Sequence, residues 1–312
     1  MTKAPHLCIV APALNEAGLL PGWLQELDKV ASELTKFRST VLIVDDGSTD
    51  ATSEVLHSLK NEFKHIEIQA LTLSRNFGHQ GALLAGLLSV PDTADVVVTM
   101  DSDGEHPATL IPALLDYWNE GHQIVHTVRL ESEELPLIKR VLSKSFYRII
   151  SRITGVKIRA GMSDFKLWDV KLIRELDAYF PHCGSLRLFA SYIAPQGPVV
   201  EFKQVVIPGR KSRFTFRKML SLAMQSVVFY SSFPMRIIGL LGIASMLAGV
   251  ALIIHVLIAY ATGKPVQGWA STMIVLVFFC GLNTLSVYVL SEYLLRISFR
   301  SRLPQYVISR RL

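Results

Sequence analysis

Apolar runs alternate with helical patterns through the first hundred residues of the chain. Four short runs, rich in β-branched residues, have the length of strands and lie at 7–10, 41–44, 66–73 and 95–100. Apolar residues at helical spacing lie between them, over 19–34, 52–63 and 80–88. This alternation predicts a layered α/β domain with a largely parallel sheet, in which right-handed crossovers bring the strand ends to one edge.

A polar cluster follows each predicted strand. In chain order the clusters are Pro12-Ala13-Leu14-Asn15-Glu16, Asp45-Asp46-Gly47-Ser48-Thr49-Asp50, Ser74-Arg75-Asn76-Phe77-Gly78-His79 and Asp101-Ser102-Asp103-Gly104-Glu105-His106-Pro107. Any one cluster could be a helix cap or a solvated turn, because Asn, Asp and Ser favour both. Four clusters at matching positions favour a binding site, since ligands of open α/β sheets bind beyond the carboxyl ends of the strands.

The fourth cluster carries the candidate chemistry. Asp101 and Asp103 follow an apolar strand one residue apart, where two carboxylates can hold a hard cation against a phosphate. No Gly-x-Gly-x-x-Gly follows the first predicted strand and no Gly-x-x-x-x-Gly-Lys-Ser/Thr occurs in the sequence, so dinucleotide-binding and P-loop sites lose their main support. A base and ribose would then be held by carboxylates and backbone groups, and a diphosphate by a metal and by cations such as Arg75 or Arg129.

Hydropathy adds a membrane part to this picture. Hydrophobic residues make up 50% of the 312 residues, and the mean hydropathy of +0.35 is high for a soluble protein. No charged residue lies between Arg236 and Lys264 or between Lys264 and Glu292, and each stretch exceeds the about 20 residues that cross a bilayer as a helix. We therefore expect a transmembrane hairpin with spans at 234–261 and 267–291. A buried hairpin in a soluble core is the alternative.

Charges set the expected orientation of this hairpin. The net charge of the chain is +6, and basic residues flank both outer ends of the hairpin, whereas its connecting loop has only Lys264. The positive-inside rule predicts an integral protein of the inner, cytoplasmic membrane, with the catalytic domain and both termini in the cytoplasm. The first residues fit a strand better than a signal peptide.

Residues 137–154 have the pattern of a basic amphipathic helix. Basic side chains recur every four residues at Arg140, Lys144, Arg148 and Arg152, with apolar residues largely on the other side. A charge run is usually a solvated face, but a face of one sign with aromatic neighbours is typical of a helix on an anionic membrane surface. We therefore expect an anionic membrane surface as a partner, and no nucleic acid.

The four clusters together resemble a known family. The segments Pro12-x-x-Asn15-Glu16, Val44-Asp45-Asp46-Gly47-Ser48-x-Asp50, Arg75-Asn76-x-Gly78 and Asp101-x-Asp103-x-x-His106-Pro107 resemble, in order and spacing, the members of glycosyltransferase family 2 that act on polyprenyl phosphates. The resemblance covers residues 6–230, with a looser match beyond. It implies a GT-A, Rossmann-like α/β domain over 1–208, an acceptor loop and juxtamembrane helix over 209–232, the hairpin over 233–295 and a basic cytoplasmic tail over 296–312.

The resemblance also implies roles for individual residues. Nucleotide contacts are implied for Pro12, Asn15, Glu16, Asp45, Asp46, Arg75, Asn76 and Gly78. The implied catalytic residues are Asp101, Asp103 and Arg129, and the two aspartates would bind Mg²⁺ or Mn²⁺ together with the diphosphate. The family usually has Gln where this chain has Glu105, which could add a third metal ligand or reject an anionic sugar.

Contacts to the acceptor phosphate are implied for Lys166, Arg210, Lys211 and Arg213. Residues 209–214 resemble the family's acceptor loop, and Ser163-Asp164-Phe165-Lys166-Leu167 resembles its Gly-Asp-Phe-Arg-Leu stretch. Lys166 stands where the family has Arg. Because Lys cannot form the bidentate phosphate clamp of Arg, we expect a different phosphate geometry.

The implied reaction is the inverting transfer of one sugar from a UDP- or GDP-sugar to a polyprenyl phosphate, undecaprenyl or dolichyl phosphate, at the cytoplasmic membrane face. The acceptor phosphate is already an anion, so a metal that stabilises the leaving diphosphate matters more than a general base. Three alternatives stay open. The first is a processive polysaccharide synthase, which the lack of a Gln-x-x-Arg-Trp motif disfavours. The second is a transferase with a soluble acceptor. The third is a catalytically silent membrane protein that binds nucleotide sugars on this fold. Paired hairpins could also form a homo-oligomer.

Overall fold

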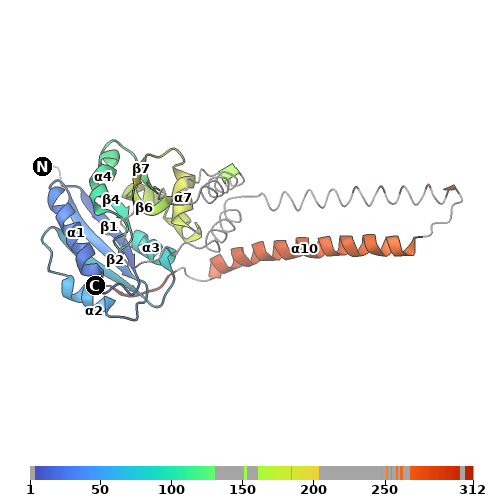
Figure 1. Ribbon diagram of the computed structural model, residues 1–312, viewed down its shortest axis with the longest axis horizontal. Helices are drawn as coiled ribbons and strands as arrows, with labels where there is room; N and C mark the ends of the chain where they lie inside the picture. Colours follow the sequence, from blue (N-terminus) through green and yellow to red (C-terminus); the bar gives the residue numbers. More distant parts are fainter. Residues whose placement is uncertain are drawn as a thin grey trace. The chain divides into compact units, whose positions relative to one another are not determined.

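The computed structural model describes residues 4–130, 151–152, 161–183, 185–203, 247, 251, 254, 258, 261–262, 268–302 and 306–311. The chain divides into two compact units. The first consists of Met1–Met219 together with Pro304–Leu312, and the second of Leu220–Leu303. The first unit holds the sheet and all four polar clusters (Figure 1).

The described residues of the first unit form one sheet of eight strands, in the order β7-β5-β6-β4-β1-β2-β3-β8. The strands are β1 (His6–Ala13), β2 (Arg38–Asp45), β3 (Ile66–Leu73), β4 (Val96–Thr99), β5 (Ile124–Arg129), β6 (Met162–Asp169), β7 (Val199–Phe202) and β8 (Ile308–Arg311). β1 pairs in parallel with β2 and β4, and β2 pairs in parallel with β3. β6 runs antiparallel to both β4 and β5, and β7 is parallel to β5. The carboxyl ends of β1 to β4 therefore lie at one edge of the sheet.

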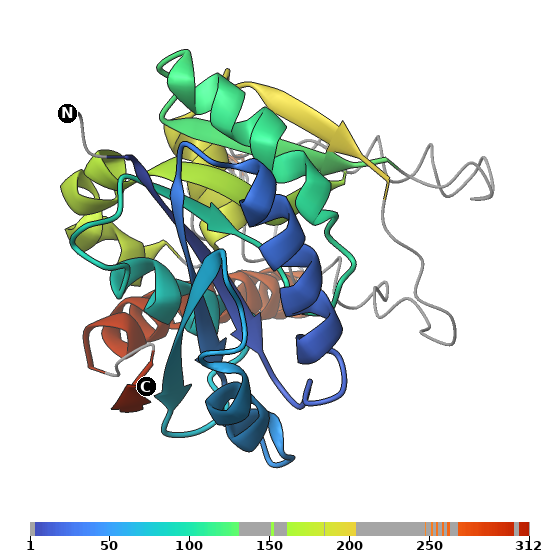
Figure 2. The ribbon, with the colours of Figure 1, turned by 90° about the vertical axis from the view of Figure 1, so that its left-hand side faces the viewer.

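Helices cover both faces of this sheet (Figure 2). One face packs against α1 (Leu20–Glu33), α2 (Thr52–Leu59) and α4 (Ile111–Asn119). The other packs against α3 (His79–Leu88), α6 (Val170–Glu175) and α7 (Leu186–Ile193). Two short 3-10 helices, η1 (Ala108–Leu110) and η2 (Asp177–His182), complete the described helices of this unit. Because both faces are covered, β1, β2 and β4 are buried along nearly their whole length, which explains their continuous apolar sequences.

The predicted order of strands and helices is confirmed for the first hundred residues. The run at 66–73 is β3 with the same bounds, and the runs at 7–10 and 41–44 are the centres of the longer strands β1 and β2. The three predicted helices are α1, α2 and α3. The layered α/β domain with parallel central strands is therefore the observed architecture.

The strand β8 comes from the C-terminal segment and was not expected. It pairs antiparallel with β3, and the Ser74 N–H donates to the Val307 carbonyl at 2.8 Å. Ser309 Oγ donates to the Thr72 carbonyl at 3.0 Å, and Ile308 packs against the core beneath β3. Residues 296–312 were expected to be a basic tail, whereas part of this segment forms the edge of the sheet beside the strand that leads into the third polar cluster.

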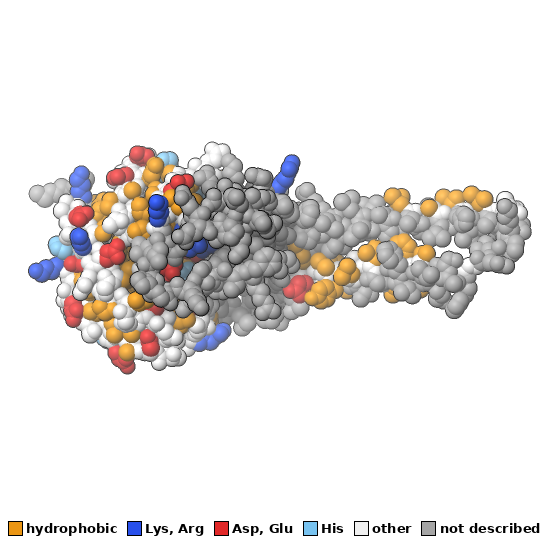
Figure 3. Space-filling view, viewed as in Figure 1, with side chains coloured by type: hydrophobic (Ala, Val, Ile, Leu, Met, Phe, Trp, Pro, Cys, Tyr) orange, Lys and Arg blue, Asp and Glu red, His pale blue; other side chains and the backbone are white. Residues whose placement is uncertain are grey.

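The second unit contains α10 (Trp269–Arg302), a helix of 34 residues. It includes nearly all of the second predicted span at 267–291, while most of the first span at 234–261 lies outside the described residues. Large apolar side chains are exposed along α10 (Figure 3), namely Leu276, Leu285, Val287, Tyr288, Leu290, Leu294 and Ile297. Among the described residues, no helix combines the length and hydropathy needed to cross a bilayer. The hairpin stays a prediction.

A close contact between helix and sheet fixes α3 on its face. Gly86 lies over β1 and β2, where an added Cβ would clash with Val10 Cγ1 and lie 2.9 Å from Val44 Cγ2. Side chains in a packed core have little room to give way. The hydrogen on Gly86 therefore allows α3 to lie close to the sheet, and α3 begins at His79, in the third polar cluster.

We expect Gly86→Ala to lower the thermal unfolding temperature of the full chain, because overpacking a core costs about 1–3 kcal/mol. Gly22→Ala is the matched control, since Gly22 is also helical and an added Cβ there meets no atom within 4 Å. That change should leave the unfolding temperature unchanged or raise it slightly, because Ala favours helix. Differential scanning fluorimetry measures both variants, and equal effects would contradict the close contact.

Candidate active site

The loops after β1 and β2 are bonded to each other. Asn15 has a φ of 56°, a left-handed conformation that Asn adopts more readily than most residues. Its Oδ1 accepts the Thr49 N–H at 2.9 Å, and its own N–H donates to Ser48 Oγ at 3.0 Å. Within the second loop, Asp45 Oδ1 accepts the Ser48 N–H at 2.9 Å. These bonds hold Asn15 and Asp45, both predicted nucleotide contacts, in one part of the sheet edge.

Asp46 joins the loops after β2 and β3. Its carboxylate accepts the N–H groups of Phe77 at 2.7 Å and Gly78 at 2.9 Å. Burial raises the pKa of Asp46, although the two N–H donors oppose the shift. Gly47, with a φ of 70°, lies so close to the third loop that an added Cβ would be 2.7 Å from the Arg75 carbonyl carbon. The Asp46 carboxylate thus fixes the loop that carries Arg75, and its predicted nucleoside contact stays a prediction.

Ser102 joins the loops after β4 and β1. Its buried Oγ lies 2.7 Å from the Pro12 carbonyl oxygen and 2.9 Å from Glu16 Oε2. The Glu16 N–H in turn donates to Thr52 Oγ1 at 3.0 Å, at the start of α2. The structure therefore brings all four predicted clusters together at the carboxyl edge of the sheet.

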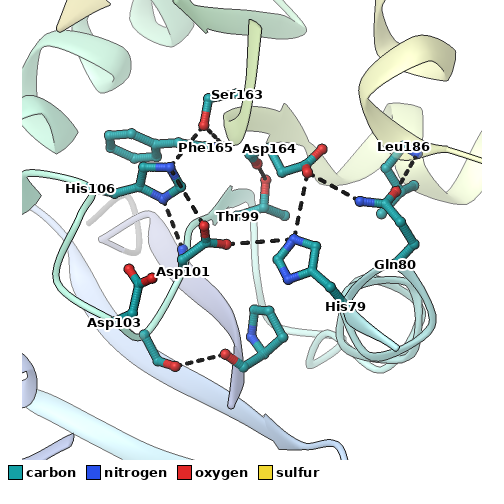
Figure 4. A network of polar contacts seen from close by, with 12 residues as sticks. His79, Gln80, Thr99, Asp101, Asp103, His106, Ser163, Asp164, Phe165 and Leu186 are labelled. Atoms are coloured by element: carbon teal, nitrogen blue, oxygen red, sulfur yellow. Dashed lines mark hydrogen bonds and ion pairs between the residues drawn. The ribbon is translucent and has the colours of Figure 1, made fainter. Parts of the chain in front are cut away.

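Asp101 is held by a histidine of its own cluster (Figure 4). The Asp101 N–H donates to His106 Nδ1 at 3.0 Å. Because Nδ1 accepts, Nε2 carries the hydrogen of the neutral ring, and it lies 2.8 Å from Ser163 Oγ and 3.7 Å from Asp101 Oδ2. The His106 ring is buried and stacks on Phe165 with 5.2 Å between ring centroids. A ring packed in the core therefore fixes the backbone of Asp101.

His79 lies between two carboxylates (Figure 4). Its Nε2 is 3.6 Å from Asp101 Oδ1 and 3.5 Å from Asp164 Oδ2. Partial burial disfavours the charged imidazole, but the hydrogen bond with Asp164 and the charge of Asp101 outweigh it and raise the pKa of His79 to about 9. The imidazole is therefore positively charged at neutral pH.

Asp164, on β6, is a buried carboxylate with 5% of its surface exposed. Arg187 Nη2 donates to its Oδ2 at 2.7 Å. Burial alone would raise the pKa of Asp164, but Arg187 and then His79 outweigh it and hold the pKa well below its usual range. The charged Asp164 is therefore a fixed part of the polar network beside Asp101.

Sequence reasoning assigned no role to His79, His106, Asp164 or Arg187. The two histidines lie inside the predicted clusters and Asp164 lies in a stretch quoted for the family resemblance, so the sequence did mark their positions. Arg187 has no such signal. It lies on α7, 23 residues after Asp164, and only the packing of α7 against the sheet brings the two together.

Asp101 and Asp103 are the two carboxylates of the fourth cluster that are predicted to hold a metal. Asp103 follows Asp101 by two residues in the loop after β4, and both are labelled in Figure 4. Asp101 Oδ1 is buried and has no hydrogen-bond donor within the described part of the chain. Among the described residues, no three His, Cys, Asp or Glu side chains form a group that could hold a metal, so Glu105 does not complete such a group with the two aspartates. Asp103 Oδ1 accepts the Glu105 N–H at 3.0 Å. Two carboxylates fit Mg²⁺, which one or two carboxylates often bind together with substrate phosphates.

Lys166, which is predicted to contact the acceptor phosphate, is buried in the structure. Its side chain is 1% exposed, and Nζ donates to the Ser163 carbonyl at 2.5 Å. Burial lowers the pKa of Lys166 to about 7, although the charge of Asp164 opposes the shift. The side chain points inward because residues of β6 alternate between the two covered faces of the sheet.

Of the other predicted cations, Arg75 lies in the third cluster, and Arg129 ends β5. The carboxyl end of β5 lies at the same edge of the sheet as that of β4, because β6 runs antiparallel to both. Arg129 is exposed at the end of β5, and its N–H donates to the Gly161 carbonyl at 2.8 Å. Arg210, Lys211 and Arg213 lie outside the described residues, as does the predicted basic helix at 137–154 apart from 151–152. Their roles stay predictions.

Comparison with protein families identifies the family of this chain. A model of the family described as glycosyl transferase family 2 matches residues 8–177, more than half of the 312-residue chain. The chain belongs to glycosyl transferase family 2. The predicted family is confirmed, and the protein is a glycosyltransferase.

Relatives align with this family 2 glycosyltransferase over nearly its whole length. It is 31% identical over 323 residues to the uncharacterized glycosyltransferase YkoT of Bacillus subtilis (strain 168), covering 97% of this chain and 91% of the relative. It is 27% identical over 307 residues to the bactoprenol glucosyl transferase of Shigella phage SfV, covering 97% of each. The similarity thus extends well beyond the residues that the family model matches.

A solved structure supports the fold of this family 2 glycosyltransferase. Mannosyl-3-phosphoglycerate synthase from Rubrobacter xylanophilus matches with a TM-score of 0.50 and 15% sequence identity, covering 72% of each chain. At this identity the match concerns the fold alone. It agrees with the GT-A-like α/β architecture that the sequence predicts.

The buried Lys166 predicts a pH dependence of stability. Its pKa is about 7 in the folded chain and about 10.5 in the unfolded chain, so between these values the unfolded chain binds the extra proton. The folded state therefore gains stability as the pH rises through this window, by an amount on the order of a few kcal/mol. Lys166→Met lacks this gain. Relative to the parent, the variant should therefore have a lower unfolding temperature at about pH 10 than at about pH 6.

Lys171→Met is the control for this measurement, because Lys171 is exposed on α6. Its unfolding temperature should differ from that of the parent by the same amount at both pH values. Thermal unfolding of the full chain in matched buffers measures the three proteins. A pH-independent difference for Lys166→Met would contradict the buried, mostly neutral lysine.

Proposed function

We propose that this glycosyltransferase moves one sugar, with inversion and with the help of a divalent metal, from a UDP- or GDP-sugar to a polyprenyl phosphate. The observation that carries the proposal is the meeting of four polar loops with Asp101 and Asp103 at the carboxyl edge of the sheet. The lipid acceptor is supported by relatives named bactoprenol glucosyl transferase. One such match covers 97% of this chain, so it includes most of the predicted hairpin.

The diphosphate of the donor would lie against the fourth cluster. Mg²⁺ or Mn²⁺, held by Asp101 and Asp103, would neutralise charge on the leaving diphosphate. His106 accepts the Asp101 backbone N–H, and the Nε2 atoms of His106 and His79 face the two carboxylate oxygens, so Asp101 would be oriented before the donor arrives. The bonds from Asp46 hold the loop of Arg75 against the second cluster, on the side proposed for the nucleotide.

The acceptor phosphate would attack from the open side of this edge. It carries its own negative charge, so it needs alignment more than a general base. Arg210, Lys211 and Arg213 are proposed to bind it, because they form a basic cluster just before the predicted spans. The two uncharged stretches would anchor the chain in the inner membrane with the catalytic unit in the cytoplasm, since basic residues flank their outer ends.

The proposed reaction predicts a lipid-linked sugar as product. Purified full-length protein is incubated with Mg²⁺ or Mn²⁺, undecaprenyl or dolichyl phosphate and a panel of UDP- and GDP-sugars, and the lipid is analysed by mass spectrometry. One donor should give a polyprenyl phosphate heavier by one sugar, and in a cell lysate this activity should sediment with membranes. No lipid product with any donor would contradict the proposed function.

Asp103→Asn tests the role of the fourth cluster in the same assay. We expect this variant to keep the unfolding temperature of the parent and to lose transfer, because a neutral amide is a poor ligand for a hard cation. Asp116→Asn, an exposed aspartate on α4, is the matched control and should transfer normally. Full activity in Asp103→Asn would remove this residue from the proposed metal site.

A further inference from the structure

We propose that His79 is a positioning residue for Asp101, and that Arg187 keeps His79 in place through Asp164. The proposal rests on the proposed function, because Asp101 matters most if it helps to hold a metal and a donor diphosphate. His79 is the first residue of α3, Asp164 lies on β6 and Arg187 lies on α7. The three side chains reach Asp101 from elements outside the fourth cluster.

A single nitrogen of His79 faces both carboxylates. Nε2 lies 3.6 Å from Asp101 Oδ1 and 3.5 Å from Asp164 Oδ2. The His79 side chain is 42% exposed, so packing restrains it only in part. Its position therefore depends on the two carboxylates, and that of Asp101 Oδ1 depends on His79, because this oxygen has no hydrogen-bond donor among the described residues.

Asp164 is fixed far more firmly than His79. Arg187 Nη2 donates to Oδ2 at 2.7 Å and Gln80 Nε2 donates to the same oxygen at 3.1 Å, while Thr99 Oγ1 donates to the Asp164 carbonyl at 2.6 Å. A buried carboxylate needs such a cation, because removing one partner of a buried pair leaves an uncompensated charge. Asp164 is thus a rigid anchor against which His79 is held.

Gln80 links this anchor to the helix that carries Arg187. Its Nε2 donates to Asp164, and its Oε1 accepts the N–H of Leu186 at 2.9 Å, at the start of α7. The first turns of α3 and α7 are therefore joined at the residues next to His79 and Arg187. Without the Arg187 guanidinium, Asp164 would compete more strongly for His79 and draw it from Asp101.

The test compares His79→Leu, Arg187→Met and Arg187→Lys in the full-length protein. Mn²⁺ binding in the presence of UDP or GDP is followed by electron paramagnetic resonance, and transfer is followed as kcat and KM for the donor. We expect His79→Leu and Arg187→Met to weaken Mn²⁺ binding by about 10–100-fold, as is usual when a residue behind a metal ligand is lost. The value of kcat should fall by a similar factor, with a smaller change in KM, and Arg187→Lys should restore much of both.

Matched controls come from exposed residues of the same types. Arg174→Met removes a surface ion pair, in which Nη2 lies 3.2 Å from Asp92 Oδ1, and His57→Leu changes an exposed histidine of α2. Both should bind Mn²⁺ and transfer sugar as the parent does. If Arg187→Met fails to fold because Asp164 is left unpaired, His79→Leu decides, since that side chain is partly exposed.

Mn²⁺ binding of His79→Leu equal to that of the parent would overturn the proposal. Folded Arg187→Met with parental Mn²⁺ binding would overturn the part played by Arg187. Failure of the proposed function would give a different result from failure of this positioning role. The parent protein would bind Mn²⁺ with UDP or GDP but would transfer no sugar to the lipid.

Discussion

The carboxyl ends of β1, β2, β3 and β4 meet at one edge of the sheet, and the loops that leave them are bonded to one another. Asp46 accepts two backbone N–H groups of the third loop, and Ser102 joins the fourth loop to the first. Gly86 lets α3 pack closely against β1 and β2. Because α3 begins in the third loop, this packing also positions that loop. Much of the site is therefore a consequence of parallel strand pairing and close helix packing.

Charge is arranged around this edge in two layers. Asp101 and Asp103 lie in the loop at the edge, and behind Asp101 the side chains of His79, Asp164 and Arg187 form a partly buried chain of alternating charge. Within this chain the buried Asp164 carboxylate faces two cations, which compensates for the cost of burying its charge. The outer pair is proposed to hold a metal and a diphosphate, and the residues behind it are proposed to orient Asp101.

The sequence predicted the parts that depend on local pattern. Period and composition identified the first strands and helices, and the polar residues at strand ends identified the four loops. The pairing of β8 with β3 joins residues more than 200 positions apart, as Ser309 and Thr72 show, and no local pattern marks such a partner. Lys166 stands where the family has an Arg, which predicted a contact with the acceptor phosphate. Its side chain is buried instead, because helices cover both faces of the sheet at β6. Arg187 likewise becomes part of the site only through the packing of α7.

The chain belongs to glycosyl transferase family 2, and the four loops are proposed to hold a nucleotide diphosphate together. The most direct test is an experimental structure of the full-length protein with Mn²⁺ and UDP or GDP, using anomalous scattering to locate the metal. We expect a manganese peak at Asp101 and Asp103, with the nucleotide against the loops of Glu16 and Asp46. A nucleotide bound elsewhere, or bound at this edge with no metal beside Asp101, would contradict it.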